Sequence, residues 1–131
     1  MEYYSTLREN LLENFICFLT YVKEEKKMHI LTPDIIIRVL EYTQKIIDPA
    51  YNPNKVNFFS LNLINFKDIL YKVLYIITEF CEMFQANVKK YIDIQKIEYL
   101  LKTFKESNED PTYEDFLIWS EEVIFAILYN N

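Results

Sequence analysis

The sequence predicts one helical domain over residues 1–131, an all-α compact bundle of about five helices around an apolar central helix. Three observations lead to this expectation. The chain contains no glycine, the residue that tight turns with positive φ favour, and a β-rich domain of this size almost always uses some. Apolar residues recur at spacings of three and four along most of the chain. With 131 residues, 51 % of them hydrophobic, the chain has the length of one domain and enough apolar side chains for a core.

The first helix is expected from about Thr6 to Lys27. Thr6 and Glu9 have the spacing of a capping box, in which each side chain bonds a backbone N–H of the first turn. One apolar face follows from the spacing of Leu11, Leu12, Phe15, Ile16, Phe18, Leu19 and Val22.

A second helix is expected to open at Thr32 and Pro33, because threonine is a good N-cap and proline is favoured at the first helical position. It is expected to end at Asp48, since a residue before proline is disfavoured in the helical region. Residues 49–55 are expected to form a loop. Residues 56–64 alternate as a strand would, but no partner strand is evident, so we expect irregular structure or a short helix. The apolar face comprises Ile35, Ile36, Val39, Leu40, Ile46 and Ile47.

The third helix, from about Asn65 to Tyr91, is the predicted centre of the bundle. Between residues 69 and 84 it is apolar almost all round, which is typical of a helix that other helices surround. Its narrow polar strip consists of Lys72, Glu79 and Glu82.

Two further helices complete the expected bundle. One spans about Ile94 to Lys105, and the last runs from Thr112, capped together with Asp115, to about Tyr129. The inward residues expected on the fourth helix are Ile94, Ile97, Leu101 and Phe104.

Cys17 and Cys81 both lie in apolar helical stretches. We expect two unpaired core cysteines, with a disulfide as the alternative, because buried free thiols behave as small hydrophobic side chains. Unpaired cysteines favour a reducing, cytoplasmic location. No signal peptide is expected, since the first ten residues lack a basic region.

The residues that most enzymes need are missing from the sequence. The single histidine, His29, has no His, Cys or Asp neighbour at the spacing of metal ligands, and we expect an incidental surface residue. Without glycine the chain has no phosphate-binding loop and no nucleophile elbow. Glu79 and Glu82 lack the Glu-x-x-His motif of di-iron bundles. We therefore expect no enzyme activity, no catalytic residues, no cofactor and no metal.

Neither nucleic acid nor membrane is expected as a direct partner. The most apolar stretch, residues 69–83, contains three charged residues, whereas a spanning helix needs about 20 mostly apolar ones. The sequence pI of about 4.8 favours a solvated helix flank over an anion site for the densest basic cluster. That cluster is Lys89, Lys90, Lys96, Lys102 and Lys105.

The net charge of −6 is concentrated at one end of the chain. Residues 106–131 carry seven acids and no Lys or Arg, whereas residues 1–105 carry 13 acids and 14 bases. On a helical wheel, four of these acids lie within about 60° of Ile118, and two aromatic residues lie closer still. The opposite side, with Phe116, Val123 and Ile127, is the expected core face, and Trp119 at its edge is either a core residue or an anchor for a partner. The predicted partner-binding residues are Glu114, Asp115, Ile118, Glu121, Glu122, Phe125 and Tyr129.

This face has three interpretations. The acids at its start fit the dipole of a helix N-terminus, and scattered exposed apolar groups are normal on a protein surface. Alternatively, apolar anchors rimmed by acids bind a protein partner with a basic surface. In the third interpretation the apolar stripe is buried against another helix.

These features predict a non-catalytic protein-binding module. The leading hypothesis is a virus- or phage-encoded inhibitor, similar in type to anti-CRISPR proteins, whose acidic C-terminal helix face blocks a basic, nucleic-acid-binding surface of a host defence protein. One alternative is a groove-type helical adaptor, in character similar to the Bcl-2-like proteins of large DNA viruses. The other is a structural protein that forms a homodimer or larger homo-oligomer through the same apolar stripe.

Overall fold

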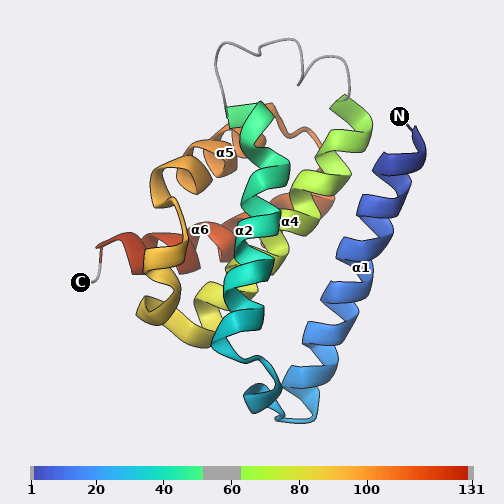
Figure 1. Cartoon of the computed structure of the whole chain (residues 1–131). Helices are drawn as coiled ribbons and strands as arrows, with labels where there is room; N and C mark the ends of the chain where they lie inside the picture. Colours follow the sequence, from blue (N-terminus) through green and yellow to red (C-terminus); the bar gives the residue numbers. More distant parts are fainter. Residues whose placement is uncertain (1, 52–62, 130–131) are drawn as a thin grey trace.

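The computed structural model describes the backbone of residues 2–51 and 63–129, and the side chains of residues 9–48, 67–127 and 129. Within these ranges there are five α-helices and no strand (Figure 1). The predicted all-α bundle is therefore confirmed. The helices are α1 (Glu2–Glu24), α2 (Pro33–Tyr51), α4 (Leu63–Phe84), α5 (Ile94–Ser107) and α6 (Glu114–Tyr129), joined in part by the short 3₁₀ helices η1 (Met28–Ile30), η3 (Gln85–Tyr91) and η4 (Pro111–Tyr113).

Helix α4 is the central element, as its composition predicts. It packs against α1, α2, α5, α6 and η3, and Figure 1 shows the other helices arranged around it. Burial of apolar surface stabilises a fold by about 25 cal/mol per Å², so this helix supplies much of the core's stability. Its buried apolar residues are Ile69, Leu70, Val73, Leu74, Ile76, Ile77, Phe80 and Cys81.

The polar strip of α4 ties the central helix to its neighbours. Glu79 is buried, with 4 % of its surface exposed, and both of its carboxylate oxygens accept hydrogen bonds from Lys23 Nζ of α1, at 3.1 and 2.9 Å. This hydrogen bonding raises the pKa of Lys23. Lys72 Nζ donates to Glu9 of α1 at 2.8 Å. The strip thus holds α1 in register along α4 at two points.

Helix α1 begins earlier than the sequence indicates and ends in a Schellman motif. Because the helix starts at Glu2, Thr6 lies inside it, and the predicted capping box at Thr6 is wrong. At the other end, Lys27 N donates to Val22 O at 2.9 Å and Lys26 N donates to the carbonyl of residue 23 at 3.3 Å. These two bonds define the motif, and Lys26, with φ of 56°, occupies the left-handed position where glycine is usual.

Helix α2 opens as predicted but extends further. Thr32 Oγ1 accepts a hydrogen bond from the backbone N–H of Ile35 at 3.4 Å, and the helix starts at Pro33. The expected end at Asp48 is wrong, since the helix continues to Tyr51. A proline near a helix end removes only one backbone hydrogen bond, and the buried pair Ile46 and Ile47 anchors the preceding turn.

Helix α4 ends at Phe84, seven residues before the predicted end at Tyr91. Gln85 has φ of 49°, which no α-helix can accommodate, and the chain continues as η3. Helix α5 agrees with its prediction at the start, where the Asp93 carboxylate accepts the N–H of Lys96 at 3.2 Å. All four of its predicted inward residues are buried.

The two cysteines differ in environment. Both are free thiols, but Cys17 is exposed, so its predicted place in the core is wrong. On α1 the buried residues are Leu12, Leu19 and Val22, and Cys17 projects from another side of the helix. Cys81 is buried on α4, and burial raises the pKa of its thiol to about 12. None of the described helices is long and apolar enough to cross a membrane.

Candidate protein-binding face on helix α6

Helix α6 is positioned by a local network at its start. Asp110 accepts hydrogen bonds from the N–H and the hydroxyl of Thr112, at 2.9 and 2.8 Å, and these bonds lower the pKa of the Asp110 carboxyl. Asn108 Oδ1 in turn accepts the N–H of Asp110 at 3.1 Å. The predicted cap formed by Thr112 with Asp115 is therefore wrong, because η4 intervenes and Asp110 caps it.

The core face of α6 is rotated from the predicted one. Ile127 is buried as expected, but Phe116 and Val123 are only half-buried. The helix packs against both α4 and α5, so its buried arc shifts towards α5. A buried serine hydroxyl in this arc lies 2.7 Å from the Thr78 hydroxyl, which satisfies both groups. The buried residues are Leu117, Ser120, Ile124 and Ile127.

Most of the predicted binding residues lie on the outer side of α6. Ile118 is 56 % exposed and Tyr129 is 70 % exposed, the two highest values among the exposed large apolar side chains described. Three acids flank them in solvent, namely Glu114, Asp115 and Glu122. We call these five residues the outer face. Ile118 and Tyr129 are therefore not buried against another helix in the described part of the chain, in contrast to the third interpretation of the sequence.

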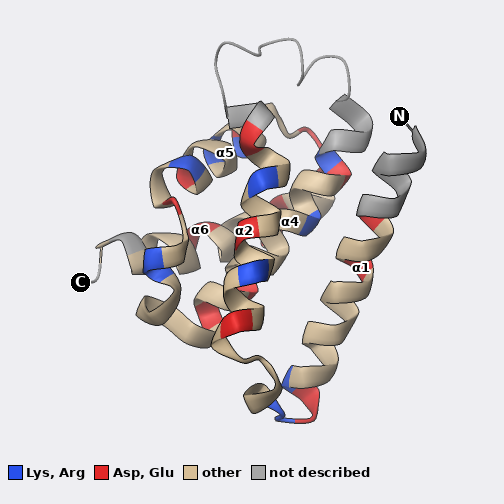
Figure 2. Ribbon diagram, in the orientation of Figure 1, with Lys and Arg blue, Asp and Glu red and all other residues tan. Residues whose placement is uncertain are grey.

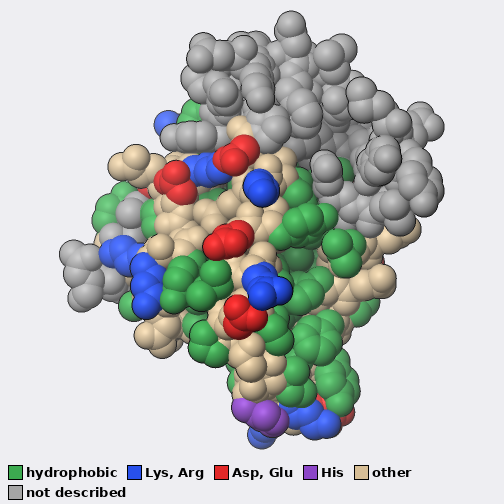
Figure 3. Space-filling view, viewed as in Figure 1, with side chains coloured by type: hydrophobic (Ala, Val, Ile, Leu, Met, Phe, Trp, Pro, Cys, Tyr) green, Lys and Arg blue, Asp and Glu red, His purple; other side chains and the backbone are tan. Residues whose placement is uncertain are grey.

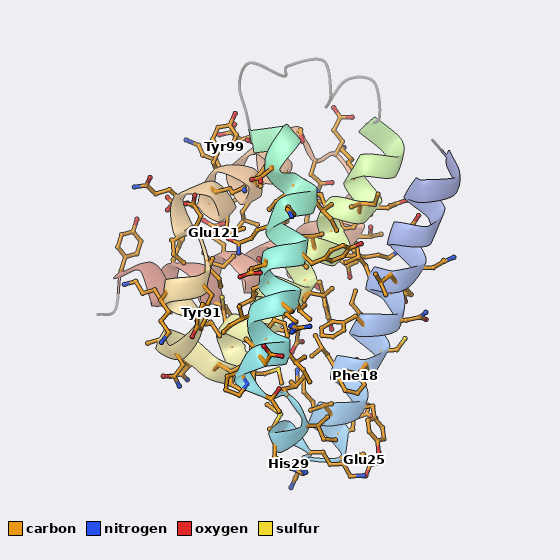
Figure 4. The ribbon with its side chains drawn as sticks, in the orientation of Figure 1. Phe18, Glu25, His29, Tyr91, Tyr99 and Glu121 are labelled. Carbon is orange, nitrogen blue, oxygen red and sulfur yellow. The ribbon has the colours of Figure 1, made fainter. Side chains whose placement is uncertain are left out.

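The two remaining residues of the predicted site lie between helices. Glu121 Oε2 accepts a hydrogen bond from Lys105 Nζ of α5 at 2.9 Å, and Figure 4 shows Glu121 on the side of α6 near α5. Phe125 is half-buried, with its ring 6.0 Å from the ring of Tyr129 in an edge-on arrangement. Folding therefore brings a base beside a segment that has none in its own sequence.

Glu121 and Phe125 line a groove between α5 and α6. Its volume is about 490 Å³. The α5 residues that line it recur at spacings of three and four, which places them on one side of that helix. The floor is apolar and the rim carries charges of both signs. Figure 2 shows positions of both charges along the α5 ribbon. We call it the α5–α6 groove; it is lined by Glu98, Leu101, Lys102, Lys105, Glu106, Glu121 and Phe125.

Trp119 belongs to the scaffold of this face. Its indole N–H donates to the carboxylate of Glu82 on α4, and its ring lies 5.5 Å from that of Tyr75. The sequence left open whether Trp119 is a core residue or an anchor for a partner, and these contacts fit the core role. Glu82 therefore serves to hold α6 against α4, as Glu79 holds α1.

Folding also divides the predicted basic cluster among different neighbours. Lys96 is buried against Asp48 of α2, and desolvation lowers its pKa. Lys102 and Lys105 line the α5–α6 groove. Three of the five lysines thus face acidic partners or the groove rather than forming one patch.

A second, smaller groove was not evident from the sequence. It has a volume of about 180 Å³ and lies between α1 and α2, with Ile76 of α4 in its lining. Leu11, expected in the core, is instead 54 % exposed at this groove, and Tyr42 is 38 % exposed. Apolar side chains are visible between these two helices in Figure 3. The spacing of Leu11 with other apolar residues predicts one face but does not show which of its members lack a covering helix.

His29, the single histidine, is exposed in η1, which Figure 4 shows at the end of the bundle where α1 ends and α2 begins. No group of three or more His, Cys, Asp or Glu residues in the described part of the chain could hold a metal ion. Every buried side-chain nitrogen or oxygen described has a hydrogen-bond partner.

Fold and face together define a helical bundle with an acidic, partly apolar exposed helix. Comparison with known proteins gives no match to a family model, to a curated protein or to a solved structure.

Proposed function

We propose that this chain is a non-catalytic protein-binding domain whose outer face on α6 binds a basic surface of another protein. The observation that carries the proposal is the combination of three exposed acids with two exposed large apolar side chains on one helix face. Protein interfaces commonly combine apolar anchors with a polar rim, and complementary charge accelerates encounter and selects partners.

Chain-wide charge supports the same proposal. The net charge is −6, and residues 106–131 contribute seven acids without a base. Clefts that bind nucleic acid are strongly basic, since they neutralise phosphates with Lys and Arg. We therefore propose an inhibitor that covers such a cleft on a host defence protein, as a virus- or phage-encoded protein would.

The test compares two triple variants in capture from a lysate of the organism that encodes the chain, or of its host. The first, Glu114→Gln/Asp115→Asn/Glu122→Gln, removes the charges of the outer face. The control, Glu24→Gln/Glu25→Gln/Glu41→Gln, removes the same charge from exposed positions elsewhere. Exposed ion pairs contribute about 0.2–1 kcal/mol each, so we expect the first variant to bind about tenfold more weakly.

The captured protein is then titrated at increasing salt. Exposed charges are screened over about 10 Å at 0.1 M salt, so binding through the outer face should fall steeply towards about 0.3 M. Equal capture by both variants would contradict the proposal. A dimer of the chain in light scattering without any partner, abolished by Ile118→Ser, would instead assign the outer face to self-association.

The groove between α1 and α2 favours a second candidate function, an adaptor that binds an apolar helix of a partner. Leu11 and Tyr42 are exposed beside it, and helix-in-groove recognition uses such surfaces. Binding of this kind would depend little on salt and would be lost in Leu11→Asp, whereas the outer-face variants would bind normally.

A further inference from the structure

The α5–α6 groove combines an apolar floor with an excess of acid at its rim. Leu101 is buried at the base, and half-buried Phe125 closes the floor on the α6 side. Three carboxylates and two ammonium groups line the rest. The outer face adds further acids on α6, so the local potential favours a cationic ligand.

The structure already shows a cation seated on one wall of this groove. Lys105 Nζ lies 2.9 Å from Glu121 Oε2, with 55 % of the lysine side chain and 29 % of the glutamate side chain exposed. A pair of this kind contributes little net free energy, because water still reaches the lysine ammonium group. Glu121 therefore has an intramolecular cation that an external one can replace at small cost.

We propose that the α5–α6 groove receives an arginine side chain of the basic partner, and that its guanidinium replaces Lys105 at Glu121. This inference rests on the proposed function and names the residue type that the partner inserts. When Lys105 turns away, three carboxylates and one ammonium group remain in the lining. The entering cation thus restores the charge balance that the ion pair provides in the free protein.

Arginine fits the groove better than lysine for two reasons. Its planar guanidinium can bond a carboxylate through two N–H groups at once, and it is more weakly hydrated than an ammonium group. It also stacks on aromatic faces, and the Phe125 ring lies four residues beyond Glu121, on the same side of α6. Leu101 supplies an apolar contact for the aliphatic stem.

The experiment uses a short blocked peptide of alternating arginine and serine, and the lysine–serine peptide of equal length. Binding to the full chain is measured by fluorescence anisotropy of the labelled peptides. The key variant is Lys105→Gln, which removes the internal cation. The matched control is Lys102→Gln, which removes the same charge from the same groove without removing the contact to Glu121.

We expect Lys105→Gln to bind the arginine peptide about three- to fivefold more tightly, the fold-change that loss of an exposed ion pair allows. Lys102→Gln should bind less than about twofold more tightly, through the general change in potential. Glu121→Gln should bind more weakly than the wild type, and the arginine peptide should bind more tightly than the lysine peptide.

Failure of this inference is distinguishable from failure of the proposed function. If Lys105→Gln and Lys102→Gln increased the affinity for the arginine peptide equally, or if the arginine and lysine peptides bound equally well, the exchange at Glu121 would be overturned. Salt-sensitive binding that requires the outer-face acids would still support the proposed function. Preference for an acidic peptide, lost in Lys105→Gln, would overturn both.

Discussion

The ion pair between Lys23 and Glu79 allows a quantitative prediction about how α1 is held. The Glu79 side chain is 5 % exposed, and Lys23 Nζ donates to both of its oxygens. Lys23→Met keeps most of the aliphatic stem but leaves the carboxylate buried without this donor. Removing one partner of a fully buried pair costs about 3–5 kcal/mol. Because the Lys23 side chain is 40 % exposed, water can reach that side, and we expect a loss of about 2–3 kcal/mol.

An exposed pair in the same protein provides the control. Arg38 Nε lies 3.3 Å from Asp34 Oδ2 on α2, and the two side chains are 78 % and 75 % exposed. Arg38→Met should therefore cost less than about 0.5 kcal/mol. Both variants are compared with the wild type by urea unfolding followed by circular dichroism, with the slope of the transition checked for constancy.

A further variant separates the ion pair from simple packing. Lys23→Met/Glu79→Met replaces both partners with apolar side chains of similar length and should recover most of the loss, because no buried charge then remains. If Lys23→Met lowers the free energy of unfolding no more than Arg38→Met does, then the pair does not hold α1 and the reasoning from burial is refuted.

Three further predictions follow from the backbone and the thiols. Lys26→Gly should raise the free energy of unfolding by about 1 kcal/mol, because φ of 56° is costly for any residue with a Cβ. Lys26→Ala keeps the Cβ and should not raise it. Equal free energies of unfolding for the two variants in urea would contradict this prediction. Under native conditions a thiol reagent should modify exposed Cys17 rapidly and buried Cys81 only at the rate of opening, and two fast thiols would be inconsistent with the fold. Burial raises the pKa of the Cys81 thiol to about 12, above its value in the unfolded chain. The stabilisation from burying the neutral thiol is therefore fully present below about pH 9, and it is lost as the pH rises towards 12, because the unfolded chain loses the thiol proton first. The wild type should lose up to about 1.4 kcal/mol per pH unit more than Cys81→Ala across this window, and equal slopes in pH-dependent unfolding would refute it.

The parts of the fold that the sequence predicts well are those with strong local periodicity. Helix α4 is apolar almost all round and lies at the centre. The four residues predicted to face inward on α5 are all buried, and Lys96 and Leu100 are buried beside them. Helix ends are predicted less well. Gln85 and Lys26 adopt positive φ without being glycine, and composition offers no signal for such positions.

The candidate site shows the same division between local and long-range information. The helical wheel places Ile118 and Glu122 opposite the expected core face, and both are exposed, although burial of the stripe against another helix was also open from the sequence. The pair between Lys105 and Glu121 joins residues 16 positions apart on different helices, and only the packing of α5 against α6 brings them together. The rotation of the α6 core face has the same origin, since its direction depends on two neighbouring helices.

The attachment of α1 to α4 has a consequence for the order of assembly during synthesis. The apolar residues Leu12, Leu19 and Val22 face α4, yet 60 residues separate the end of α1 from the end of α4. At about 5–20 residues per second, the first helix waits about 3–12 s on the ribosome before its binding surface is complete. During this time the apolar residues of α1 lack the surface that buries them in the folded chain. We therefore expect the bundle to assemble only once α4 has emerged, because α1 packs mainly against α4.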